Sequence, residues 1–94
     1  MRLRWKRRAL QDFFRIKRHI ARHNPVAAEE IGIEIQNAAL HLKTLPRLGH
    51  AGERTSVLEL QVPGRPYVLP FRINGEVIEI LTVFDQRRNP EDKF

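Results

Sequence analysis

The pattern of apolar and polar positions in the last third of the chain predicts a β-hairpin. From Pro66 to Arg88 the sequence reads PYVLPFRINGEVIEILTVFDQRR, with an apolar, β-branched and aromatic run on each side of Asn74-Gly75. This dipeptide suits the positive-φ turn that joins antiparallel strands. The predicted strands are residues 67–73 and 76–85, and the second is apolar on both faces, which favours a central position. Pro70 has no N–H to donate to a sheet, so we expect a bulge or a locally unpaired edge there.

Two further patterns predict a pair of helices before these strands. Residues 7 to about 23 carry apolar positions near helical spacing beneath a strongly basic outer face. Asn24-Pro25 suits the start of a second helix, because Asn caps a helix N-terminus and Pro fits the first helical position. This helix is expected to run to about Leu45 and to end in the loop 46–52, which contains Pro and Gly. Its expected inner stripe consists of Ala28, Ile31, Ile35, Ala38, Leu42 and Leu45.

Two short alternating segments predict the remaining strands. Residues 2–5 place Leu3 and Trp5 on one face, and residues 54–62 place Leu58, Leu60 and Val62 on one face. The predicted order is therefore β-α-α-β-β-β. We expect one α+β domain over residues 1–94, in which a helical hairpin packs on a small antiparallel sheet.

Composition narrows the class of protein. A hydrophobic content of 41% is typical of a globular chain, and the absence of Cys excludes disulfides and thiolate metal sites. The sequence has no apolar run of membrane-spanning length and no signal-peptide pattern, so a cytoplasmic location is expected. The formal net charge is +6, and residues 1–24 hold nine Lys and Arg residues but one acid, Asp12. Such a surface attracts polyanions: nucleic acid, an acidic protein segment or a ribosome.

The chain resembles toxins of the RelE/ParE superfamily, the toxic halves of bacterial toxin–antitoxin pairs. The resemblance extends over nearly the whole length. It is carried by Trp5 and Ala9, then by NPVAAEEIGIEI, PRLGHAGERT, VLELQV and the hairpin PYVLPFRINGEVIEILTVFDQRR. It implies the same β-α-α-β-β-β fold and a partner antitoxin whose C-terminal segment wraps around the toxin. RelE-like members cut messenger RNA in the ribosomal A site, whereas ParE-like members target DNA gyrase.

Two positions favour the ParE-like branch. Cutting RNA requires a proton acceptor, a proton donor and cations beside the phosphate. The resemblance implies an Arg early in the third strand of RelE-like members and a His or Tyr after the last strand. Here Tyr67 and Asp85 fall in those regions. An ionised Asp repels phosphate and cannot readily act as an acid.

The candidate site residues follow from these two branches. Arginine suits carboxylate and phosphate groups, so the expected target-binding residues are Arg72, Arg87 and Arg88. The expected antitoxin-binding residues are Ile33, Leu40 and Arg18. If the protein is a ribonuclease, the candidates become Arg54, Arg72, Arg87 and His50. His19 and His23 are spaced i, i+4 but lack a third ligand, so neither a metal site nor a cofactor is expected.

Three functions remain open at this point. The first is a ParE-like toxin of a type II toxin–antitoxin system, of the plasmid-stabilisation kind, that inhibits DNA gyrase and blocks replication. It would be neutralised by a ParD-like antitoxin and would meet nucleic acid only indirectly. The second is a RelE-like, ribosome-dependent messenger RNA endoribonuclease. The third is a basic nucleic-acid-binding module without toxicity.

Overall fold

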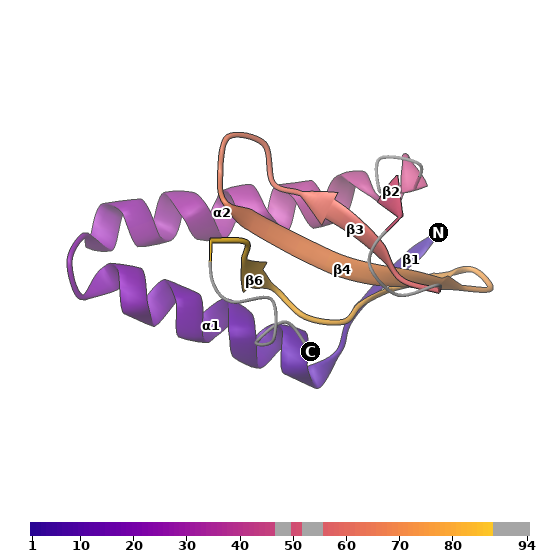
Figure 1. Ribbon diagram of the computed structural model, residues 1–94, viewed down its shortest axis with the longest axis horizontal. Helices are drawn as coiled ribbons and strands as arrows, with labels where there is room; N and C mark the ends of the chain where they lie inside the picture. The colour runs from indigo at the N-terminus through magenta and orange to yellow at the C-terminus, as the bar shows by residue number, and fades with distance from the viewer. Residues whose placement is uncertain (47–49, 52–55, 88–94) are drawn as a thin grey trace.

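The computed structural model describes residues 1–46, 50–51 and 56–87 as two helices against a sheet (Figure 1). Helix α1 (Arg7–Ala21) and helix α2 (Pro25–His41) run side by side. The strands are β1 (Arg2–Trp5), β2 (His50–Ala51), β3 (Leu58–Gln61), β4 (Tyr67–Asn74), β5 (Val77–Ile80) and β6 (Phe84–Asp85). The α+β class is confirmed. The predicted order β-α-α-β-β-β corresponds to β1, α1, α2, β3, β4 and β5; β2 lies within the expected loop 46–52, and β6 is a further short strand.

The sheet is mixed rather than antiparallel. Its strand order is β1-β5-β4-β3-β2, and β6 pairs with β4 away from that path. Strand β1 runs parallel to β5, while the other pairings are antiparallel. The chain leaves β1 through two helices and three intervening strands, and such a long crossover permits parallel pairing. The expectation of an antiparallel sheet was therefore wrong at this edge, whereas β5 has the predicted central position.

Pro70 coincides with a break in the last predicted strand. Phe71 pairs with Ile80 and Val68 pairs with Phe84, so two residues of β4 stand opposite the three residues 81–83. The Leu81 N–H donates to the Pro70 carbonyl at 2.8 Å, but the pairing then shifts by one residue. The predicted irregularity is thus present, and the extra residue belongs to the partner strand. The continuous strand expected over residues 76–85 is split into β5 and β6.

The hairpin turn lies one residue later than Asn74-Gly75. Asn74 pairs with Val77, which leaves Gly75 and Glu76 as a two-residue loop. Gly75 has a φ of +60°, and no residue other than glycine has a positive φ in the described chain. A glycine at the first loop position with positive φ is typical of a type II′ hairpin.

The second helix starts as predicted but ends earlier. The Asn24 side chain accepts a hydrogen bond from the Ala27 N–H at 3.1 Å, and Pro25 opens the helix. The helix ends at His41, and Leu45 is 57% exposed instead of joining the inner stripe. After Leu40, hydrogen bonds run from the N–H of residue i+3 to the carbonyl of residue i, which tightens the last turn. In addition, Pro46 disfavours helical geometry at Leu45.

The core lies between the helices and one face of the sheet. The α2 stripe residues from Ala28 to Leu42 are buried as predicted, and Leu60 and Val62 of the β3 region join them. Trp5 meets Phe13 edge to face, with ring centroids 5.7 Å apart. Leu10 and Phe14, two apolar positions of α1, lie on the surface instead.

Candidate functional site

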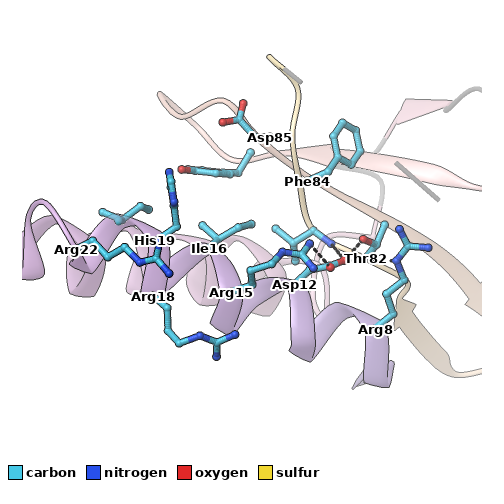
Figure 2. Close-up of a pocket in the computed structure, with 13 residues that line it drawn as sticks. Arg8, Asp12, Arg15, Ile16, Arg18, His19, Arg22, Thr82, Phe84 and Asp85 are labelled. Atoms are coloured by element: carbon cyan, nitrogen blue, oxygen red, sulfur yellow. Dashed lines mark hydrogen bonds and ion pairs between the residues drawn. The ribbon is translucent and has the colours of Figure 1, made fainter. Parts of the chain in front are cut away.

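A groove of about 610 Å³ lies between α1 and the segment that contains β6 (Figure 2). Helix α1 supplies one wall and residues 82–85 supply the other, with Tyr67 of β4 alongside. The lining residues are Arg8, Asp12, Arg15, Ile16, Arg18, His19, Ile20, Arg22, Tyr67, Thr82, Val83, Phe84 and Asp85. We call this feature the α1–β6 groove.

The buried carboxylate of Asp12 holds the two walls of the groove together. Asp12 is only 3% exposed. Its Oδ2 accepts a hydrogen bond from the Thr82 hydroxyl and lies 3.5 Å from the Val83 N–H. Its Oδ1 accepts from Arg15 at 2.6 Å, and the Arg8 guanidinium lies 3.7 Å from Oδ2. No motif in the sequence predicts this role, although Asp12 is the one acid among residues 1–24.

The spacing of residues along α1 explains this arrangement. Residues 8, 12, 15 and 19 recur at i, i+4, i+7 and i+11, so they share one face of the helix. Arg8 and Arg15 therefore flank Asp12 and offset its charge. Residues 82 and 83 lie between β5 and β6, where the pairing with β4 is interrupted. Asp12 supplies the acceptor that a neighbouring strand would otherwise provide.

Arg87 is exposed but paired with Asp85. Its Nε lies 2.9 Å from Asp85 Oδ1 and its Nη2 lies 2.6 Å from Oδ2, while its backbone N–H also donates to Oδ1. The hydrogen bond to Asp85 and the charge of that carboxylate raise the pKa of Arg87 above its ordinary value. Tyr67 pairs in register with Asp85 across β4 and β6, and its side chain is buried.

Arg72 belongs to a different cluster, on the sheet face away from the helices. Its Nε donates to Glu79 at 2.8 Å, and Lys6 and Arg4 lie 3.7 Å and 3.9 Å from the same carboxylate. The hydrogen bond from Arg72 is the main reason that the pKa of Glu79 lies below its ordinary value of 4.5. Burial opposes that shift, and the charges of Arg72, Lys6 and Arg4 assist it.

Arg72 and Arg87, two of the residues expected for a ribonuclease, lie in different parts of the sheet. Arg72 lies five residues along β4 from Tyr67, the residue that pairs with Asp85. That separation is about 17 Å along a strand. Arg54 and Arg88 lie outside the described residues, and His50 is described in its backbone, as part of β2.

An apolar stripe follows the outer side of the helical hairpin. Ile33 and Leu40, both expected antitoxin contacts, are 55% and 51% exposed. Leu10 and Phe14 on α1 and Val26 on α2 are also exposed. Lys17 crosses Gly32 where the helices pack and pairs with Glu29 at 3.3 Å. We call Leu10, Phe14, Val26, Ile33 and Leu40 the outer apolar stripe; Arg18 lines the α1–β6 groove instead.

Metal ligands and membrane segments are not found in the described part of the chain. The His19 and His23 rings meet edge to face with centroids 6.1 Å apart. Within residues 1–46, 50–51 and 56–87, no three His, Cys, Asp or Glu side chains are grouped to hold a metal ion. Over the same residues, neither helix is long and apolar enough to span a membrane.

Comparison with known proteins assigns the class of molecule. Residues 3–90 match the model of a family described as the ParE toxin of the type II toxin–antitoxin system parDE. The curated "Putative toxin Y4kP" of Sinorhizobium fredii is 38% identical over 82 residues, which are 87% of this chain and 84% of that protein. The chain therefore belongs to the ParE toxin family of type II toxin–antitoxin systems.

A solved structure agrees with this assignment. The chromosomal ParDE toxin–antitoxin system from P. aeruginosa contains a chain that superposes with a TM-score of 0.84 at 27% identity. The superposition covers 90% of this chain and 95% of that one. The same match supports the arrangement of two helices on a mixed sheet.

We expect Asp12→Ala to destabilise the fold by about 2–3 kcal/mol, because the Thr82 hydroxyl and the Val83 N–H lose a buried acceptor. Urea unfolding of Asp12→Ala, Thr82→Val and the double variant measures the coupling, which should be about 1 kcal/mol or more. The exposed Glu30→Ala serves as the control and should stay within about 0.5 kcal/mol of the parent. Additive effects at residues 12 and 82 would contradict the proposed contact.

The lowered pKa of Glu79 predicts a pH-dependent stability. A carboxylate whose pKa is lowered on folding stabilises the fold at pH values above its ordinary pKa of 4.5. This stabilisation is lost as the pH falls through the pKa of the folded state. Glu79→Gln should therefore cost most at pH 7, and its difference from the parent should shrink toward pH 3. The exposed Glu76→Gln should show no such trend. A Glu79→Gln difference that stays constant between pH 7 and pH 3 would contradict the ionic account.

Proposed function

We propose that the protein inhibits DNA gyrase and thereby blocks replication, and that a ParD-like antitoxin neutralises it in the cytoplasm. Membership of the ParE family and the likeness to a ParDE structure support the antitoxin partner. The observation that carries the choice of target is the state of Tyr67 and Asp85. They fall where the RelE-like pattern implies catalytic groups, yet here a buried phenol lies in register with a carboxylate that already pairs with Arg87.

The alternative, a RelE-like messenger RNA endoribonuclease, has weaker support. Attack by a 2′-hydroxyl needs a proton acceptor and a donor to the leaving oxygen at the same phosphate, with cations to stabilise the charge that develops. Asp85 places a negative charge there, and its carboxylate is bound by the guanidinium of Arg87. Arg72, the cation on the strand, is bound to Glu79. It lies about 17 Å along β4 from Tyr67, the residue that pairs with Asp85.

Arg72, Arg87 and Arg88 are the proposed target contacts. Arg87 is 70% exposed in its side chain, so one edge of its guanidinium remains accessible while Asp85 orients the other. Arg72 is about half exposed and is oriented in the same way by Glu79. An arginine held by a carboxylate has already lost much of its side-chain freedom, which reduces the entropy cost of a further contact.

A gyrase supercoiling assay with purified protein tests the proposed target. The protein should inhibit supercoiling and accumulate gyrase–DNA cleavage complexes. The double variant Arg87→Ala, Arg88→Ala should need a concentration about tenfold higher or more, as expected for arginine contacts at an interface. It should still bind the antitoxin. Arg2→Ala, Lys43→Ala is the charge-matched control and should retain the parent's potency.

Two results would contradict this proposal. Rapid loss of messenger RNA in cells without cleavage complexes would favour the ribonuclease. Full growth arrest by the Arg87, Arg88 double variant would place the target contact elsewhere on the surface.

The outer apolar stripe is the proposed docking surface for the antitoxin. Ile33 and Leu40 lie seven residues apart on α2, so they recur two turns apart on one side of the helix. Leu10 and Phe14 present a similar pair, spaced i, i+4, on α1. Exposed apolar side chains at these spacings suit an amphipathic helix or an extended segment laid across the hairpin.

Substitutions in this stripe should separate neutralisation from toxicity. Ile33→Glu or Leu40→Glu should weaken antitoxin binding about tenfold or more, because the complex would bury an unpaired carboxylate. Co-expression with the cognate antitoxin would then fail to restore growth, although growth arrest by the toxin itself would persist. Ile73→Glu, on the exposed end of β4, is the matched control. Full rescue of both stripe variants would move the antitoxin contact away from this surface.

A further inference from the structure

We propose that the α1–β6 groove binds single-stranded nucleic acid through its phosphodiester backbone. This inference is independent of the gyrase proposal, because it concerns a direct contact made by residues other than Arg72, Arg87 and Arg88. It also differs from the expectation that the protein meets nucleic acid only indirectly.

The charge of the groove favours an anionic ligand. Four arginines line it against two carboxylates. Asp12 is engaged by Thr82, Val83 and Arg15, and Asp85 is engaged by Arg87. In the described part of the chain, neither Arg18 nor Arg22 forms an ion pair. Two guanidinium groups are therefore available at one end of the groove, and the acids that would repel a phosphate are already neutralised.

The placement of the cations favours a linear polyanion. Arg8 and Arg15 of α1 and Arg22, its C-cap, recur every seven residues, and Arg18 lies within the same span. Seven residues are about two helical turns, so the row extends over about 21 Å from Arg8 to Arg22. Figure 2 shows Arg8, Arg15 and Arg22 along the helix, with His19 rising toward Asp85, whereas Arg18 points away from the opposite wall of the groove. Arg8 and Arg15 are paired with Asp12, and their side chains are 50% and 66% exposed. The exposed edge of the Arg15 guanidinium and the guanidinium of Arg22 are therefore the planar forks that suit successive phosphates of an extended strand.

The opposite wall supplies aromatic surface. Phe84 is half-buried beside the groove, whereas Tyr67, which lines the groove from β4, is only 6% exposed and offers little ring surface. Bases of a single strand stack on aromatic side chains, whereas those of a duplex are already stacked on each other. The combination of arginines with the Phe84 ring thus favours single-stranded nucleic acid over both a duplex and an acidic peptide.

Fluorescence anisotropy of the full chain with labelled 12-mers of dT and rU tests the proposal. Both strands should bind with an affinity that falls as salt rises. Arg18→Gln, Arg22→Gln should weaken binding and lower the slope of log K against log salt by about 1.4, that is, about 0.7 for each lost phosphate contact. Arg2→Gln, Lys43→Gln removes the same charge far from the groove and should leave the slope nearly unchanged. Circular dichroism and urea unfolding check that each variant is folded.

A second variant separates stacking from charge. Phe84→Leu keeps an apolar side chain but removes the ring, so it should weaken binding of both strands without changing the salt slope. Preferential binding of dT or of rU identifies DNA or RNA as the ligand, and either result supports the proposal.

Three results would overturn the proposal. The first is an equal loss of affinity in the groove variant and in its charge-matched control, which would indicate diffuse attraction to the whole basic surface. The second is competition by a poly-glutamate peptide as strong as that by unlabelled dT, which would identify an acidic peptide as the ligand. The third is tighter binding of a 12-base-pair duplex than of either single strand.

Discussion

The contact between Asp12 and residues 82–83 is the interaction on which the α1–β6 groove depends. The pairing of β4 with β5 and β6 is interrupted at Pro70, where the partner segment contains one extra residue. Backbone groups in such a segment need other partners if they are to be buried. Asp12 of α1 provides such a partner, because its buried carboxylate accepts hydrogen bonds from both the Thr82 hydroxyl and the Val83 N–H. The same contact sets β6 beside α1 and so forms the α1–β6 groove.

The sequence predicts those parts of the fold that depend on local chemistry. Asn24 and Pro25 start α2 as expected, and Gly75 supplies the positive φ of the hairpin. The inner stripe of α2 also follows from its spacing. By contrast, the parallel pairing of β1 with β5 depends on which edge of the sheet the first strand joins. Neighbouring positions in the sequence carry no signal for that choice.

The site is harder to predict than the fold for a similar reason. Asp12 and Thr82 are 70 residues apart, and neither belongs to a motif. Arg87 and Arg72 are exposed, as expected for target contacts, but the sequence does not reveal that each is paired with a carboxylate. Leu10 and Phe14 read as helical apolar positions, yet the packing of α1 against α2 leaves them on the surface. The strongest signal in the sequence is the pattern of the family, and the comparison with ParE toxins confirms it.

Helix α1 carries two surfaces of opposite character. Leu10 and Phe14 belong to the outer apolar stripe, whereas Arg15 and His19 line the groove. Successive residues of an α-helix are rotated by about 100° around its axis, so the two pairs lie well apart around α1. A partner on the hairpin and a ligand in the groove would therefore occupy different sides of one rigid element. Asp12 fixes the groove side of that element to the end of the sheet.

Amide hydrogen exchange in the parent and in Asp12→Ala tests this central role most directly. The Val83 and Gln86 amides lie in the segment that Asp12 secures, whereas the Lys6 amide, which donates to Ile80 at 2.9 Å, reports on the sheet before the break. The account predicts that residues 83 and 86 lose more protection than residue 6 in the variant, because the segment opens locally. An equal loss of protection at all three amides would show that Asp12 contributes only to global stability and would contradict the account.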